Sequence, residues 1–254
     1  MVEVIWLQFD IIFPAFVAGM LVLLTHVPMG QEVLRRGIIF LDLAIAQVAA
    51  LGVVVASAIG VHSSWLQQVL AMLTAIGGAL MLAQLRRFDA KIQEAIIGIL
   101  FVLAATGSIL LLAKDPHGGE RLTDMLVGQI LWLQWQDLIL ASLVYVVVMA
   151  VWHWGRKRSD ILFYPIFAIT ITLSTQLVGV YLVFCCLIIP ALATLNSSNA
   201  ISKAYGIGAL GFALGLSVSV WWDLPSGAAV VWALSATALA YSFLVRALTS
   251  GKVT

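Results

Sequence analysis

The sequence has very few charged residues. Only 10% of its 254 residues are Asp, Glu, Lys or Arg, whereas 63% are hydrophobic and the mean hydropathy is +1.09. A soluble globular chain carries about 25% charged residues. A large soluble core cannot explain the deficit, because such a core would still need a polar surface. The composition excludes a soluble domain of any size and predicts a protein that crosses a membrane several times through short loops.

Several sequence signals that carry chemistry are also absent. The chain has no GxxxxGK[ST] phosphate loop, no HExxH, no GxSxG and no CxxC. Its two cysteines, Cys185 and Cys186, are adjacent in an apolar run, which excludes a disulfide framework. The net charge of +1 predicts no nucleic-acid partner. If the protein transports actively, the energy must come from another chain or from an ion gradient.

The apolar runs predict an all-α polytopic membrane protein with a single domain over residues 1–254. A spanning helix needs roughly 20 apolar residues, and we expect nine such spans. They are residues 5–27, 37–60, 65–85, 94–113, 134–154, 160–178, 179–195, 205–222 and 226–247. The sixth and seventh are short and nearly continuous, so a single long helix or a broken pair stays open. Residues 122–135 are predicted to form an interfacial or re-entrant helix. The N-terminus lacks a basic region and a cleavage site, so we expect the first span to be retained.

The positions of the basic residues predict the orientation. With nine spans and the N-terminus outside, only Lys114 and Arg121 of the 13 basic residues fall on the outer side. The others are Arg35, Arg36, Arg86, Arg87, Lys91, Arg156, Lys157, Arg158, Lys203, Arg246 and Lys252. Because cytoplasmic loops carry an excess of Lys and Arg, we expect an outer N-terminus and a cytoplasmic C-terminus.

The stretch RRGIIFLDLAIAQVAALG, residues 35–52, places a carboxylate and an amide inside the second span. A carboxylate in a bilayer costs about 2.5 to 3.5 kcal/mol on insertion scales, so it usually faces a pathway or a partner. We therefore predict that Asp42 lines a path, with a structural pairing to a neighbouring helix as the alternative. Gln47 either lines the same path or joins helices by hydrogen bonding. His26 is expected at the surface, near the end of the first span.

Four stretches, in order, resemble the permease subunit of the zinc/manganese/iron family of ABC importers. They are LRRGIIFLDLAIAQVAALG (34–52), EAIIGILF (94–101), MLVGQILWLQWQDL (125–138) and VGVYLVFCCLIIPALATL (178–195). The first is similar to a helix signature in which an aspartate and a histidine, four residues apart, precede a glycine. Measured back from Gly52, the histidine falls on Gln47 and the aspartate on Leu43, so Asp42 stands one residue early.

This departure has a geometric consequence. Five residues rotate by about 140° on a regular helix, so Asp42 and Gln47 would not share a face. A one-residue π-bulge would restore a common face, and such bulges often lie at functional sites. In the fourth stretch, Cys185 and Cys186 replace small residues. Thiolates favour zinc and Cu(I), so Cys185 is a third candidate on the path, and the alternative is a small buried hydrophobe.

The resemblance implies a multi-pass permease of the inner cell membrane, surrounded by lipid, that works as a homodimer. It implies a cytoplasmic ATPase subunit, an extracytoplasmic metal-binding protein and a divalent transition metal as cargo, zinc ahead of manganese or iron. ATP hydrolysis would belong to the partner chain, so the permease itself is not an enzyme and has no covalently bound cofactor.

The resemblance also implies a site for the ATPase. The segment NSSNAISK follows the seventh span, and the family has a short coupling helix there. Residues Ser197, Ser198, Asn199, Ala200 and Ile201 are the expected contacts, with Ser198 as the N-cap. An ordinary loop is the alternative. Two other functions stay open: a gradient-driven metal carrier, and a non-transporting membrane scaffold with a degenerate site.

Overall fold

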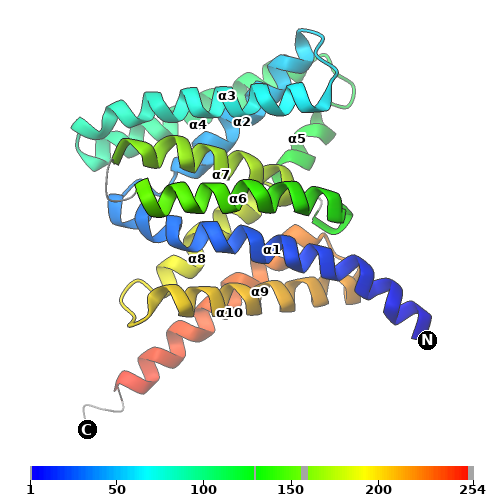
Figure 1. Cartoon of the computed structure of the whole chain (residues 1–254), viewed down its shortest axis with the longest axis vertical. Helices are drawn as coiled ribbons and strands as arrows, with labels where there is room; N and C mark the ends of the chain where they lie inside the picture. The colour runs from blue at the N-terminus through cyan, green and yellow to red at the C-terminus, as the bar shows by residue number, and fades with distance from the viewer. Residues whose placement is uncertain (1, 129, 156–159, 251–254) are drawn as a thin grey trace.

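The computed structural model describes residues 2–128, 130–155 and 160–250, with side chains from residue 12 to residue 247 apart from residues 129 and 155–160. In these ranges every regular element is helical (Figure 1). The elements are α1 (Val2–Arg36), α2 (Leu41–Ala58), α3 (Ser64–Ala83), η1 (Gln84–Arg87), α4 (Ala90–Leu112), α5 (Gly118–Val127), η2 (Ile130–Trp132), α6 (Trp135–Gly155), η3 (Asp160–Leu162), α7 (Phe163–Val178), α8 (Val180–Ala193), α9 (Ala200–Trp222) and α10 (Ser226–Ser250). The predicted all-α fold is confirmed.

Seven of these helices are long and apolar enough to cross a membrane: α1, α2, α3 with η1, α4, α6, α9 and α10. Each coincides with one of the predicted spans, so the protein is a multi-pass membrane protein. The sixth and seventh predicted spans correspond to α7 and α8, which have 16 and 14 residues and are bent by 120° against one another. The broken pair left open by the sequence is therefore what forms. The count of nine spans stays a prediction.

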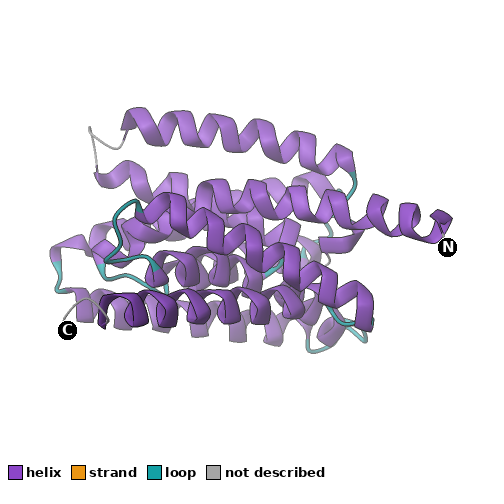
Figure 2. Cartoon of the chain, turned by 90° about the horizontal axis from the view of Figure 1, so that it is seen from below, coloured by secondary structure: helices purple, strands orange, loops and turns teal. Residues whose placement is uncertain are grey.

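The connections between helices gather at two ends of the bundle (Figures 1 and 2). The α1–α2, α3–α4 and α8–α9 connections lie at one end, and the α2–α3, α4–α5 and α9–α10 connections lie at the other. The first end, here called the basic end, carries Arg35, Arg36, Arg86, Arg87, Lys91, Lys203 and Arg246 at helix termini. Lys114 and Arg121 belong to the opposite end. Arg156, Lys157, Arg158 and Lys252 lie outside the described residues.

Small residues allow close helix packing in this bundle. A Cβ atom on Gly208 would stand 2.6 Å from the side chain of Leu23, which lies on α1. On the same helix, α9, a Cβ atom on Gly211 would stand 2.6 Å from Leu234 of α10. Helices in lipid associate largely through such packing. The glycines of α9 therefore hold this helix between α1 and α10.

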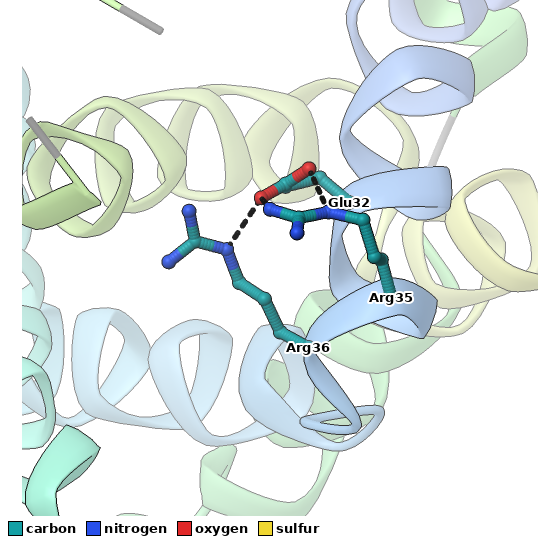
Figure 3. Close-up of polar contacts among 3 residues, drawn as sticks. All are labelled: Glu32, Arg35 and Arg36. Atoms are coloured by element: carbon teal, nitrogen blue, oxygen red, sulfur yellow. Dashed lines mark hydrogen bonds and ion pairs between the residues drawn. The ribbon is translucent and has the colours of Figure 1, made fainter. Parts of the chain in front are cut away.

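A group of three charged side chains closes the basic end of α1 (Figure 3). Glu32 is only 4% exposed and accepts hydrogen bonds from Nε of Arg35 at 2.9 Å and from Nε of Arg36 at 2.7 Å. The Arg36 guanidinium also lies 4.5 Å from the ring centroid of Phe163 on α7. Charge-assisted hydrogen bonds are stronger than neutral ones. The cluster fixes the end of α1 beside the start of α7.

Candidate functional site

Asp42 lies in the first turn of α2, the second residue of that helix. Its side chain is buried, 1% exposed. The backbone N–H groups of Asp42 itself and of Leu43 lie near its carboxylate, but neither oxygen accepts a well-formed hydrogen bond from the described residues. A helix N-terminus favours a negative charge, which offsets part of the cost of burial. The residue is thus close to the basic end of its helix rather than at the middle of a span. Its side chain is buried because other residues of the chain cover it, not because it lies deep in the membrane.

Helix α2 contains no π-bulge, so nothing restores a common face to Asp42 and Gln47. Helix α2 is a regular α-helix from Leu41 to Ala58, so Asp42 and Gln47 point from different faces. Gln47 lies on the face with Leu43 and Ala50, at helical spacings of four and three residues. Asp42 falls instead on the stripe of Ala46 and Ala49. The five-residue spacing therefore places Asp42 and Gln47 on different faces of α2, as expected for a regular helix.

Gln47 and Cys185 line one cavity of about 600 Å³. Leu43 and Ala50 of α2 belong to its wall, and helices α4, α5, α8 and α10 complete it. Gln47 is buried, whereas Cys185 is partly exposed, so its thiol is accessible from the cavity. The wall is otherwise mainly apolar. The structure thus brings together two of the three predicted path residues, and Asp42 is not among the residues that line this cavity.

Asp42 is nevertheless a neighbour of that cavity. Its carboxylate lies close enough to the Cys185 thiol, and to the Glu94 carboxylate on α4, for the groups to interact electrostatically. Oε1 of Glu94 accepts a 3.0 Å hydrogen bond from the backbone N–H of Phe40, while Oε2 is buried and unpartnered within the described chain. The sequence interpretation missed Glu94 as a site residue. The available signal was its position inside EAIIGILF, one of the four resembling stretches.

A second, more polar cavity of about 430 Å³ lies between α2, α3, α5 and α7. Gln67, Asp124, Thr172 and Gln176 contribute polar groups to it. It shares Ala50, Met125 and Val180 with the larger cavity. The two cavities are therefore neighbours inside a single chain, and no sequence pattern had indicated the polar one.

Within the described ranges of one chain, no group of three or more His, Cys, Asp or Glu side chains could hold a metal ion. His26 is fully buried rather than at the surface as expected. Its Nδ1 lies 2.9 Å from the carbonyl oxygen of Val22 and 3.0 Å from the hydroxyl of Thr25. These contacts on its own helix fix the orientation of the imidazole ring.

The segment predicted to contact an ATPase lies in the α8–α9 connection at the basic end (Figure 1). It is a turn followed by the start of α9, not a separate short helix. Asn199, with a left-handed backbone at φ 58°, is the N-cap, so the prediction of Ser198 as the N-cap is wrong. The hydroxyls of Ser197 and Tyr241 lie 2.8 Å apart, which ties the turn to α10. Ser198 and Ile201 are exposed.

This helical architecture is similar to that of a solved structure, and the sequence matches a family model. Over 95% of its length the chain is similar to 95% of a chain in the solved structure of PsaBC from Streptococcus pneumoniae in complex with Fab, with a TM-score of 0.75 and 17% sequence identity. At that identity the similarity shows a shared fold. A sequence model of the family described as ABC 3 transport family matches residues 8–159 and 155–246. The resemblance to a family of ABC importer permeases is thus confirmed, and the chain belongs to the ABC 3 transport family.

Proposed function

We propose that this chain is the membrane-spanning permease subunit of an ABC importer for divalent transition metal ions. A separate cytoplasmic ATPase would supply the energy, and an extracytoplasmic binding protein would deliver the cargo. The observation that carries the proposal is Asp42, a buried carboxylate whose oxygens accept no well-formed hydrogen bond in the described chain, beside a cavity that an amide and a thiol line. In a chain of this family, such a residue is best explained by a positively charged cargo.

The ligand chemistry favours zinc, with manganese or iron next. The Cys185 thiol is a soft ligand that suits zinc, whereas the Gln47 amide oxygen and the Asp42 carboxylate are harder. One chain does not assemble a cluster of three or more such groups in its described part. We infer that the permease works as a homodimer and that the cargo crosses between the protomers. Two copies would then double the ligands along the path.

The arrangement of charge supports an inner-membrane protein with its basic end in the cytoplasm. The helix termini at this end carry seven of the basic residues that the described ranges contain, and Lys114 and Arg121 belong to the other end. By the positive-inside rule, the N-terminus would be outside and the C-terminus cytoplasmic. The turn at residues 197–199 and the start of α9, which lie at this basic end, would then dock on the ATPase.

The proposal is tested by ATP hydrolysis of the reconstituted complex of permease, ATPase and binding protein. Zinc, manganese, iron, cobalt and nickel are compared in wild type, in Asp42→Asn and in Asp223→Asn. Asp223 is an exposed residue at the opposite end whose left-handed backbone suits Asn equally well. We expect one metal to stimulate ATP turnover, Asp42→Asn to abolish the stimulation and Asp223→Asn to retain it. Metal-independent turnover that Asp42→Asn leaves unchanged would contradict a metal path through Asp42.

A second candidate is a non-transporting membrane subunit with a degenerate site. The regular helix α2 favours it, because this helix keeps Asp42 off the face of Gln47. Such a subunit would copurify with its partners yet show no cargo-dependent ATP turnover. A gradient-driven carrier, in contrast, would move metal into proteoliposomes that contain no ATPase at all.

A further inference from the structure

Glu94 lies on the cavity-facing side of α4. The residues of this helix that line the cavity with Gln47 and Cys185 are Phe101, Ala105 and Ile109. Glu94 precedes Phe101 by seven residues, which is two helical turns on the same face. It therefore continues this lining stripe toward the start of α4, and hence toward the basic end. Glu94 is thus located between the cavity-lining part of α4 and the basic end.

Asp42 reaches the same place from α2. The two carboxylates are electrostatic neighbours, and Asp42 is also a neighbour of the Cys185 thiol. The ring of Phe40 stacks on Phe184 with centroids 6.4 Å apart and planes within 9°. Because Phe184 lines the cavity, this stack joins the N-terminal end of α2 to the cavity wall. Phe40, directly before α2, thus contacts α4 through Glu94 and α8 through Phe184.

Three carboxylate oxygens in this pair are buried and accept no well-formed hydrogen bond in the described chain. They are both oxygens of Asp42 and Oε2 of Glu94. An isolated buried carboxylate is costly unless it is paired or coordinates a metal ion. The half-buried Glu94 carboxylate beside Asp42 adds to this cost, because the two charges repel. Oxygens of this kind, from two helices, are suitable ligands for a divalent cation.

We propose that Glu94 and Asp42 together form a dicarboxylate binding site for a divalent metal ion, between the cavity of Gln47 and Cys185 and the basic end of the chain. The inference rests on the proposed function, which assigns only Asp42, Gln47 and Cys185 to the path. It adds Glu94 as a second acidic ligand, and it adds a second binding position for the ion along the path. The ion leaves the mixed amide and thiol surroundings of the cavity and is then held by oxygen ligands alone.

A purely structural role for Glu94 makes a different prediction. Oε1 of Glu94 accepts the N–H of Phe40 and so anchors the α1–α2 connection to α4. Glu94→Gln retains an oxygen that accepts this hydrogen bond and removes only the charge. Loss of metal binding in Glu94→Gln, with unchanged thermal stability, would therefore reveal a ligand and not an anchor. Glu120→Gln is the matched control, since the Glu120 side chain is 74% exposed on α5.

The test measures Mn²⁺ binding to the full-length permease, purified with its ATPase in lipid nanodiscs, by the electron paramagnetic resonance signal of free Mn²⁺. Displacement of bound Mn²⁺ by Zn²⁺ reports zinc affinity in the same samples. We expect Glu94→Gln and Asp42→Asn each to weaken Mn²⁺ binding by at least about tenfold. Glu120→Gln should bind as wild type does, and Glu94→Asp should retain part of the affinity.

The outcomes separate this inference from the proposed function. Mn²⁺ binding by Glu94→Gln at wild-type affinity overturns the dicarboxylate site. If the wild-type complex still shows metal-stimulated ATP turnover in that case, the importer proposal stands. A wild-type complex that neither binds Mn²⁺ nor responds to any metal in ATP turnover overturns the proposed function itself. Weaker Mn²⁺ binding in both acidic variants, with intact binding in the Glu120→Gln control, supports the site.

Discussion

Gly179 lies so close to Gly128 that a Cβ atom added to Gly179 would stand 2.5 Å from the backbone nitrogen of Gly128. Both residues have a positive φ, 83° and 71°, with ψ near 160°. This region of backbone conformation is essentially confined to glycine. The contact joins the end of α5 to the break between α7 and α8. Two glycines far apart in the sequence thus set the sharp bend of the broken helix pair.

Gly179→Ala is expected to destabilise the protein. The left-handed backbone alone costs about 1–3 kcal/mol for a residue with a Cβ atom, and the clash with Gly128 adds to it. We expect a lower unfolding temperature in detergent and reduced ATP turnover of the assembled complex. Gly98→Ala is the control, because a Cβ atom there would meet no described heavy atom within 4 Å. An unfolding temperature equal to wild type in Gly179→Ala would contradict this account of the bend.

Ser174→Ala should cost more stability than Tyr145→Phe. The two hydroxyls lie 2.6 Å apart in the core between α6 and α7, and Ser174 donates at 2.7 Å to the carbonyl oxygen of Thr170. The Tyr145 hydroxyl is therefore the donor to Ser174. Tyr145→Phe removes one hydrogen bond, about 0.6 kcal/mol in a membrane protein. Ser174→Ala removes two and leaves a buried hydroxyl without its acceptor, about 1–3 kcal/mol.

Unfolding titrations of both variants in detergent provide the comparison. Ser217→Ala is the control, because Ser217 is exposed and donates only to the carbonyl oxygen of Ala213 on its own helix. Its effect should stay within about 0.5 kcal/mol. If Tyr145→Phe proved the more damaging change, the assigned direction of the hydrogen bond would be wrong.

Much of the fold could be predicted because apolar run length alone determines a spanning helix. The seven helices that pass the length and hydropathy criteria all coincide with predicted spans. The α7–α8 break stayed open because its cause is not local. The apolar run continues through Gly179, and the bend depends on contact with Gly128. Likewise, residues 122–135 gave an apolar signal, but α5 ends at Val127 where Gly128 reverses the backbone.

The candidate site was only partly predictable for a related reason. Gln47 and Cys185 share a cavity, as residues of one predicted path should. The apolar residues around Asp42 predict that it lies inside the span 37–60, yet α2 begins only at Leu41, after Gly37 with φ 67°. Glu94 looked like a helix-flanking charge. Its partner Phe40 is 54 residues away, and no local pattern records such a contact.

Gln47→His should increase the response to zinc. Gln47 lines the same cavity as the Cys185 thiol, and an imidazole suits zinc better than an amide oxygen does. We expect half-maximal stimulation of ATP turnover at about tenfold lower zinc concentration, which corresponds to about 1.4 kcal/mol of binding free energy. The response to manganese, which prefers oxygen ligands, should change less. Gln84→His, at an exposed position near the basic end, is the control. An unchanged zinc response in Gln47→His would place Gln47 outside the path.

Ile201→Glu should release the ATPase without affecting the fold of the permease. Ile201 is 43% exposed in the first turn of α9, beside the turn that the Ser197–Tyr241 hydrogen bond fixes. A carboxylate there costs little in the free chain, but it would be buried without a partner in a docked complex. We expect loss of copurifying ATPase, an unchanged unfolding temperature and retained Mn²⁺ binding. Leu224→Glu provides the control, because Leu224 is 47% exposed at the opposite end. Wild-type ATPase stoichiometry with Ile201→Glu would move the docking surface away from the α8–α9 connection.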